Sequence, residues 1–213
     1  MKVVIIANGE LPEHLLLTSP INQSDLLIAA DGGANYCYTL GLIPDILVGD
    51  LDSIDPAILV QYKAKKIEIC RHPVKKNATD LELAMDLAKA RGAKKIHLIG
   101  VLGGRWDMSL GNILLAASFK YKTIKLSLTG PDCLMHIFHP NKLHQLTDAA
   151  GRRVSLLPIN GDVHGVSLCG FAYTLANHTI IAGSSLGTSN IIQGEEATVR
   201  LEEGTLLCVQ SRD

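Results

Sequence analysis

Short, uninterrupted apolar runs alternate with amphipathic segments along the first two-thirds of the chain. Strands that are buried on both faces of a sheet have this texture, because neither face meets water. The pattern predicts six strands, at residues 3–7, 26–30, 46–48, 67–70, 95–100 and 124–129. Between them it predicts four helices, at residues 33–40, 56–63, 80–91 and 109–119. This alternation favours a mainly parallel sheet with helices on both faces.

The pattern of apolar and polar residues changes from about Leu134 onward. Apolar and polar residues then alternate, Gly, Asn or Asp recur at short intervals, and no segment has the pattern of a helix. Such a pattern is typical of antiparallel strands joined by tight turns. We therefore predict an α/β domain at residues 1–138, followed by a small antiparallel β-sandwich domain at residues 139–213, with the turn at "HPNK" between them.

The composition is that of a globular protein with a well-filled core, since 47% of the 213 residues are hydrophobic and 19% are charged. The net charge of −1 gives no global field that would attract nucleic acid or an acidic membrane surface. No stretch approaches the length of a membrane span. The five cysteines are odd in number, widely spaced and never in a Cys-x-x-Cys, which favours reduced thiols and a cytoplasmic location.

Acidic residues follow several of the predicted strands. Asp31, Asp50, Asp52 and Asp107 each come after an apolar run, and Asp80 opens a predicted helix. Ligands of an open parallel sheet bind beyond the carboxyl ends of its strands, so we expect these acids to meet at one edge. Asp50 and Asp52 are two residues apart and would point the same way in extended backbone. Clustered carboxylates suit Mg²⁺, which takes a few carboxylates together with substrate phosphates.

Two pairs of glycines stand beside these acids, Gly32 with Gly33 and Gly103 with Gly104. Glycine lets backbone N–H groups approach a phosphate closely, and the helix N-termini that follow favour anions. The charge of the phosphate would be balanced by Arg105 and by Lys75 or Lys76.

Each acid also has a structural explanation. Asp107 could cap a helix, Asp80 could complement a helix dipole, and Asp31 could form a turn before its two glycines. Their coincidence at one sheet edge favours a common site, because independent turns would be spread over both ends. The chain has no Gly-Lys dipeptide and no Gly-x-Gly, which excludes a Walker A loop and a dinucleotide fingerprint.

Five motifs taken together resemble the thiamin pyrophosphokinase family. They are "DGGAN" at 31–35, "PDILVGDLDS" at 44–53, "NATDLELAM" at 77–85, "GGRWD" at 103–107 and "SLGTSN" at 185–190. The resemblance spans nearly the whole chain, and the motifs stand in the family's order. It implies transfer of a pyrophosphoryl group from ATP to the hydroxyl of thiamin, giving thiamin diphosphate and AMP. It further implies Mg²⁺ and a homodimer, with the thiamin site where the β domain of one subunit meets the partner.

The same resemblance implies roles for individual residues. Asp52 or Asp80 would accept the proton of the thiamin hydroxyl, and the sequence leaves that choice open. Arg105 matches the family's arginine beside the phosphates, and Asn112 would help to order the start of its helix. The positions for Mg²⁺ and the ATP phosphates are Asp31, Asp50, Asp52, Asp80 and Asp107, with close backbone approach at Gly32, Gly33, Gly103 and Gly104.

The motif "SSLGTSN" carries no charge, so it suits a heteroaromatic ring better than a phosphate. By resemblance, its thiamin-binding residues would be Ser185, Thr188, Ser189 and Asn190. Without the resemblance the same stretch would be interpreted as a hairpin loop rich in turn formers. Three features depart from the family: Met108 replaces a typical histidine, Asn77 replaces a common acid, and the one tryptophan, Trp106, lies outside the β domain.

Two other functions remain open at this point. A pyrophosphokinase that acts on another alcohol, such as a pterin, would use the same acids but would have no reason to share "SLGTSN". A non-catalytic sensor of thiamin or nucleotide would need the pocket without the full set of five acids. A pterin pyrophosphokinase would form AMP with a pterin but not with thiamin. A sensor would form no AMP with any alcohol.

Overall fold

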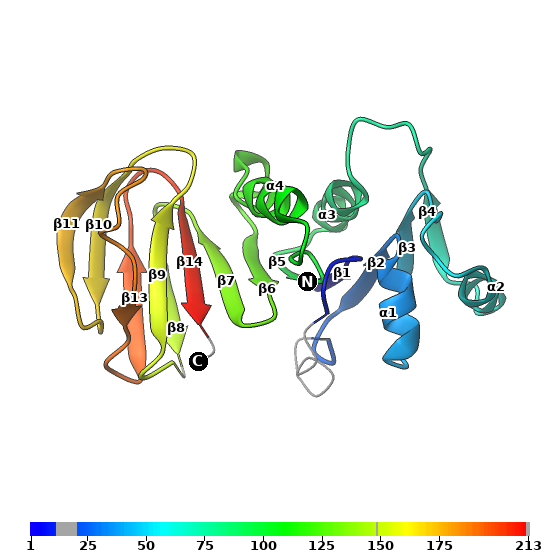
Figure 1. The fold of residues 1–213 in the computed structure, drawn as a ribbon, viewed down its shortest axis with the longest axis horizontal. Helices are drawn as coiled ribbons and strands as arrows, with labels where there is room; N and C mark the ends of the chain where they lie inside the picture. The colour runs from blue at the N-terminus through cyan, green and yellow to red at the C-terminus, as the bar shows by residue number, and fades with distance from the viewer. Residues whose placement is uncertain (12–20, 148, 212–213) are drawn as a thin grey trace. The chain divides into compact units, whose positions relative to one another are not determined.

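The computed structural model describes residues 1–11, 21–147 and 149–211. The chain divides into two compact units (Figure 1). Each unit has its own cluster of buried hydrophobic residues. The first, here called the α/β unit, comprises Met1–Ala116 and Thr123–Pro131. The second, the β unit, comprises Ala117–Lys122 and the chain from residue 132 onward. Among the helices described, none is long and apolar enough to cross a membrane.

Six strands of the α/β unit pair in parallel, in the order β6-β5-β1-β2-β3-β4. All six predicted strands are present, and their ends lie within one residue of the predicted ones. Most of their residues are buried, because helices cover the sheet. The strands are β1 (Lys2–Ile6), β2 (Leu26–Ala30), β3 (Ile46–Gly49), β4 (Glu68–Arg71), β5 (Lys95–Ile99) and β6 (Lys125–Thr129).

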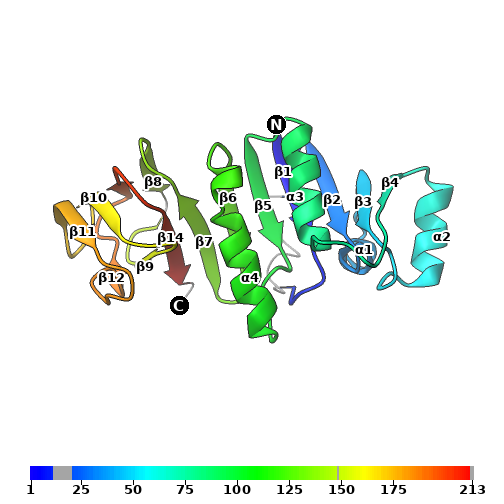
Figure 2. The same ribbon diagram turned by 90° about the horizontal axis from the view of Figure 1, so that it is seen from above.

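Helices α1 (Gly33–Thr39) and α2 (Pro56–Ala64) share a core cluster with alternate residues of the strands, including Val4, Leu47 and the α2 residue Tyr62. Helix α3 (Asp80–Ala90) also contacts β1, β2 and β3, and it buries Leu81, Ala84, Met85 and Ala88 on one face. Strand residues point alternately to opposite faces, so α3 covers the other side of the sheet. Figure 2 shows α3 and α4 (Trp106–Ala116) side by side over that sheet.

The predicted helix at 109–119 is displaced in the structure. Helix α4 begins three residues earlier, at Trp106, and ends at Ala116. A separate 3-10 turn, Phe119–Tyr121, follows, because the Ser118 hydroxyl accepts a hydrogen bond from the Lys120 N–H and caps a new start. The shift matters for the site, since it places the "GGRWD" acid inside the first turn of α4.

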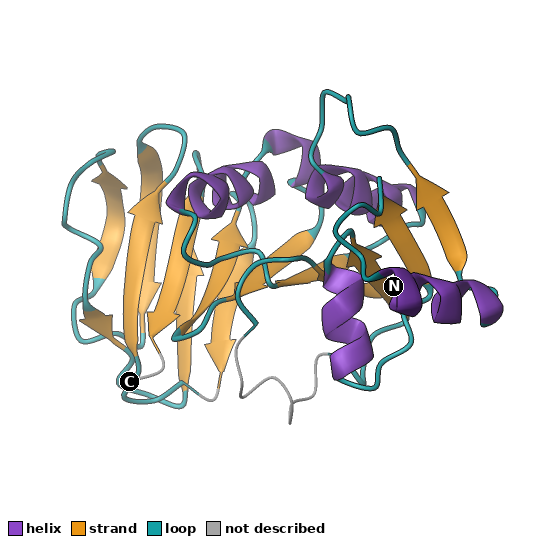
Figure 3. Ribbon diagram, turned by 45° about the vertical axis from the view of Figure 1, so that its right-hand side comes forward, coloured by secondary structure: helices purple, strands orange, loops and turns teal. Residues whose placement is uncertain are grey.

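The β unit contains two layers of antiparallel strands. One has the order β12-β9-β14-β7 and the other the order β11-β10-β13-β8. Residues of both layers, such as Leu156 and Val199, share one buried cluster, which confirms the predicted sandwich. Figure 3 shows the strands in orange: β7 (Cys133–Phe138), β8 (Leu143–Thr147), β9 (Arg153–Pro158), β10 (Val163–Cys169), β11 (Leu175–Ile180), β12 (Asn190–Ile191), β13 (Glu196–Arg200) and β14 (Leu206–Ser211).

The division of the chain differs from the predicted boundary at residue 138. Strand β7 belongs to the β unit, because it pairs along its length with β14 from the far end of the chain. The last change of unit along the chain therefore falls after Pro131, before β7, whereas "HPNK" lies within the β unit. Of the predicted second domain, residues 148, 212 and 213 lie outside the described part of the chain.

Strand order fixes where a ligand fits in the α/β unit. The chain moves outward from β1 through β2 and β3 to β4, then returns to β5 on the other side of β1. The connections after β1 and β5 therefore diverge, and a crevice opens beyond the carboxyl ends of these two strands.

Candidate functional site

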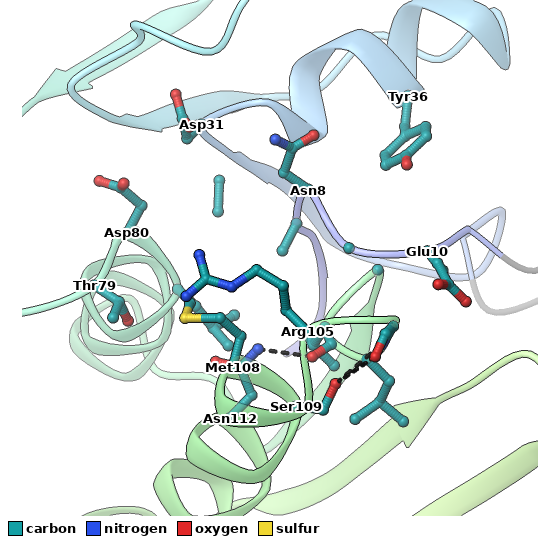
Figure 4. A pocket seen from close by; sticks show the side chains of 18 of the residues that line it. Asn8, Glu10, Asp31, Tyr36, Thr79, Asp80, Arg105, Met108, Ser109 and Asn112 are labelled. Carbon is teal, nitrogen blue, oxygen red and sulfur yellow. Dashed lines mark hydrogen bonds between the residues drawn. The ribbon is translucent and has the colours of Figure 1, made fainter.

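A cavity of about 790 Å³ lies beyond the carboxyl ends of β1, β2 and β5 in the α/β unit. The loops after β1 (Ala7–Glu10) and β5 (Gly100–Arg105) line it, together with the first turns of α3 and α4. Figure 4 shows Asp31 and Asp80 at one side of this cavity and Tyr36 and Glu10 at the other. Its position agrees with the crevice that the strand order creates.

Three carboxylates converge at the ends of β2 and β3. One oxygen each from Asp31, Asp50 and Asp52 lies within 4.8 Å of the other two. Asp31 and Leu51 adopt left-handed backbone, with φ of 45° and 70°. The side chain of Leu51 is buried in the core, so the turn that carries the acids on either side of it is anchored. The structure thus brings three of the five predicted acids together at one sheet edge.

The reason for this convergence differs from the predicted one. Strand β3 ends at Gly49, so Asp50 and Asp52 do not stand on extended backbone. The left-handed turn at Leu51 brings them together, and the Asp52 N–H donates to Asp50 Oδ1 at 3.3 Å. The Ser53 N–H donates to Asp31 Oδ1 at 3.4 Å, which links the two loops.

Lys76 forms ion pairs with two carboxylates of this region. Its Nζ lies 2.7 Å from Asp50 Oδ2 and 3.1 Å from Asp80 Oδ1. All three side chains are largely buried, with exposed fractions of 14%, 12% and 22%. The hydrogen bond from Lys76 lowers the pKa of the Asp50 carboxyl, and the same bond raises the pKa of Lys76. Of the two lysines that the sequence left open, the structure brings Lys76 to the acids.

Asp80 sits at the first residue of α3, after the N-cap Thr79, whose hydroxyl accepts a hydrogen bond from the Glu82 N–H at 3.2 Å. Burial raises the pKa of Asp80, Lys76 opposes the rise, and the negative charges of Asp50 and Asp31 add to it. Asp80 Oδ1 would lie 2.9 Å from a Cβ placed on Gly49, whose φ is +138°. Glycine at residue 49 therefore makes room for Asp80 beside the acid cluster.

The glycines of "GGRWD" have partners within the protein. The Gly104 N–H donates to Glu10 Oε1 at 2.8 Å, and the Gly103 N–H donates to the Ser109 hydroxyl at 3.0 Å. Asn112, predicted to order the helix start, is buried and donates from Nδ2 to the Val101 carbonyl at 2.7 Å. That contact fixes the loop after β5 to the second turn of α4.

The first glycine pair has a packing role in the structure. A Cβ on Gly33 would lie 2.0 Å from the Ile6 carbonyl oxygen, and one on Gly32 would lie 2.4 Å from Asn8 Cγ. These residues let α1 approach β1 closely. Gly32 precedes the seven-residue α1 and caps it without a side-chain bond.

Asp107 does not join the acid cluster, in contrast to the sequence prediction. It lies in the first turn of α4, two-thirds exposed, and pairs with Arg105. The Arg105 guanidinium lowers the pKa of Asp107. Arg105 itself lines the cavity.

Several residues that line the cavity were not among the site residues predicted from the sequence. Asn8 and Glu10 follow the first predicted strand, and Tyr36 and Ser109 stand in α1 and α4. The rule that led to the acids, the carboxyl end of a parallel strand, applies equally to "IIANGE" and would have found the first two.

In the β unit, the stretch 183–190 forms a well-bonded turn. The Asn190 amide is buried, donating to the Tyr173 carbonyl at 2.7 Å and accepting from the Tyr173 N–H at 3.0 Å. Thr188 Oγ1 donates to the Ser185 carbonyl at 2.7 Å. Asn190 therefore joins two segments of the unit, whereas Ser185, Thr188 and Ser189 are exposed.

Comparisons with known proteins agree with the two-unit architecture. The model of the thiamin pyrophosphokinase catalytic domain matches residues 17–128, and that of the thiamin pyrophosphokinase vitamin B1 binding domain matches residues 136–206. The thiamine pyrophosphokinase of Bacillus subtilis is 32% identical over the whole of both chains. Thiamine pyrophosphokinase 1 of rice (Oryza sativa subsp. japonica) is 27% identical over 93% of this chain and 82% of the relative. The crystal structure of the Bacillus subtilis protein superposes with a TM-score of 0.86, at 30% identity and full coverage of both chains.

Proposed function

Because this chain belongs to the thiamin pyrophosphokinase family, we propose that the cavity and the acid cluster of its α/β unit are where the reaction takes place. The protein transfers a pyrophosphoryl group from ATP to the hydroxyl of thiamin, giving thiamin diphosphate and AMP. One observation carries the assignment of the site: three carboxylates converge at the sheet edge whose cavity, at about 790 Å³, has the size of a small-molecule pocket.

The donor set fits a hard divalent cation. Oxygens of Asp31, Asp50 and Asp52 lie close enough together to share one ion, and Mg²⁺ prefers a few carboxylates plus phosphate oxygens. When bound, Mg²⁺ would neutralise charge on the triphosphate. We assign these three residues as its holders. Asp107 is left out, because it lies apart from them and is paired with Arg105.

The chain's own residues supply positioning and charge. Arg105 lines the cavity with a guanidinium that suits phosphate oxygens. Transfer of this kind depends on alignment and electrostatics more than on a covalent nucleophile. For the thiamin hydroxyl proton, Asp80 is the better candidate of the two that the sequence left open, since Asp80 lines the cavity and Asp52 does not.

We assign thiamin recognition to the β unit, which the vitamin B1 binding model matches. The exposed hydroxyls of Ser185, Thr188 and Ser189 remain candidates for polar contacts to the pyrimidine. Asn190 stays in this set only as a residue that shapes the turn, because its amide is engaged by backbone. Replacing both serines by alanine should raise the KM for thiamin and leave the KM for ATP unchanged.

A homodimer with the thiamin site at the subunit interface is part of the proposal, supported by the family. Sedimentation of the purified chain at micromolar concentration tests it, and a monomer with full activity would exclude it. We also propose a cytoplasmic location, supported by five free cysteines in the described structure.

The reaction is tested by incubating the protein with ATP, Mg²⁺ and thiamin and following AMP and thiamin diphosphate. Equal amounts of both products, dependent on thiamin and removed by EDTA, would support the proposal. AMP formation with a pterin in place of thiamin would support the alternative alcohol. Tight binding without turnover of any alcohol would support a sensor.

A further inference from the structure

Lys76 occupies an unusual place for a cavity lysine. Its ammonium group touches two carboxylates at once, and both contacts are shielded from water by neighbouring residues. A solvated lysine can swing freely, whereas this one is held between β3 and α3 by Asp50 and Asp80. Lysine carries a compact charge on a flexible stem, so it can also leave such a position without unfolding anything.

The acids around it would otherwise repel one another. Asp31, Asp50 and Asp52 converge within 4.8 Å, and Asp80 lies across Gly49 from Asp31. Opposite charge nearby is what keeps such carboxylates ionised. Lys76 supplies that charge from the cavity side, where it shares Asp50 with the acid cluster.

We propose that Lys76 is the internal counter-ion of the acid cluster, which holds Asp50 and Asp80 in place and weakens the binding of a free divalent cation. This inference rests on the proposed metal site. A cation at the cluster must share Asp50 with the ammonium group, and two positive charges at that distance repel each other. A triphosphate brings its own negative charge and offsets that repulsion, so the ion enters together with the nucleotide.

The test measures binding of Mn²⁺, as a spectroscopic probe for the divalent ion, to the metal-stripped protein without nucleotide. Lys76→Met removes the charge and keeps an unbranched side chain of similar bulk, and it should strengthen Mn²⁺ binding at least tenfold. Lys76→Arg retains the charge and should leave the affinity within about threefold of the parent. Lys75→Met is the matched control, because it removes the neighbouring exposed lysine.

The unfolding temperature provides a second readout, because Lys76→Met should lower it although the same change strengthens Mn²⁺ binding. Without metal, Lys76→Met leaves the acids uncompensated and should unfold at a lower temperature than the parent. Added Mn²⁺ should recover most of that loss, in proportion to its tighter binding. A purely structural lysine would lower the melting temperature without tightening the binding of the ion.

The outcomes separate this inference from the proposed function. Unchanged or weaker Mn²⁺ binding by Lys76→Met would overturn the counter-ion role, even if parent turnover depends on Mg²⁺ as expected. If parent turnover survives EDTA, the metal site itself is refuted. Tighter binding in Lys76→Met but not in Lys75→Met would support the inference.

Discussion

The acid cluster should make the metal-free protein less stable than it would be without one of its charges. Asp52 is the suitable residue to change, because it is exposed and its carboxylate accepts a hydrogen bond only from the adjacent Ser53 hydroxyl, at 3.1 Å, among the contacts described. Asp52→Asn keeps the shape of the side chain and removes its charge. Little packing is lost, so electrostatics decide the sign.

The magnitude follows from the separation of the carboxylates. At the 4.8 Å that bounds the cluster, two unit charges repel by about 1 to 3 kcal/mol, depending on the effective dielectric constant. Lys76 already neutralises Asp50, so the repulsion between Asp52 and Asp31 dominates. Solvent screening reduces the expected gain in unfolding free energy to about 0.5–2 kcal/mol. For a chain of this size, that raises the melting temperature by about 2–6 °C.

The turnover of Asp52→Asn should fall, although its stability without metal should rise. Losing one group that stabilises charge at a transition state costs about a hundredfold or more in turnover. The assay is thermal unfolding in EDTA at low salt, together with thiamin-dependent AMP release in Mg²⁺. In about 1 M salt the stability gain should shrink, because the Debye length falls to about 3 Å. Asp132→Asn, the same change at an exposed position outside the cavity, serves as control.

Either of two results would contradict the predicted role of Asp52. A metal-free Asp52→Asn protein that is less stable than the parent would show that the carboxylates do not repel one another. Normal turnover would show that Asp52 has no part in the reaction.

Three further predictions concern neighbouring parts of the structure. Gly49→Ala should cost about 1–3 kcal/mol and depress turnover, since its φ is +138° and its Cβ would meet Asp80; denaturant unfolding measures the first effect. Asn112→Ala should cost about 1–3 kcal/mol because it orphans the Val101 carbonyl, and Asn112→Asp, which cannot donate, should be no better; a fully stable Asp variant would contradict this. Burial lowers the pKa of His139, so stability that is complete above about pH 6.5 is lost as the pH falls toward the lowered folded pKa. His139→Gln should lose less stability than the parent between pH 7.5 and 5.5, and equal losses would exclude a role for this group.

The strands and the acid cluster were predictable because two simple rules determine them. A parallel sheet covered on both faces needs continuous apolar runs, and its connections bring successive carboxyl ends to one edge. Asp31 and Asp50 obey that rule because each directly follows a strand, and Asp52 comes two residues after Asp50. The backbone that brings them together was not predictable, since nothing in "DLD" specifies left-handed Leu51.

Features that depend on where a helix begins, or on a hydrogen bond to a residue far away in the chain, could not be predicted from the sequence. Asp107 follows a strand as the other acids do, but α4 begins at Trp106 and carries it into solvent beside Arg105. The Asn190 amide donates a hydrogen bond to the Tyr173 carbonyl, seventeen residues away in the chain. Its role in the turn therefore depends on a contact that the local sequence pattern does not encode. The partner of Glu10 is Gly104, on a different loop, for the same reason.

The two units are interleaved along the chain, which bears on how this protein can be engineered. Residues 117–122 belong to the β unit although β6, the last strand of the α/β unit, comes after them. No single cut therefore separates the two: a break after residue 116 removes β6 and bares the edge of β5, and a break after residue 131 leaves part of the β unit behind. A vitamin-binding module taken from a relative could replace this one only as a two-piece graft with three matched splice points, after residues 116, 122 and 131.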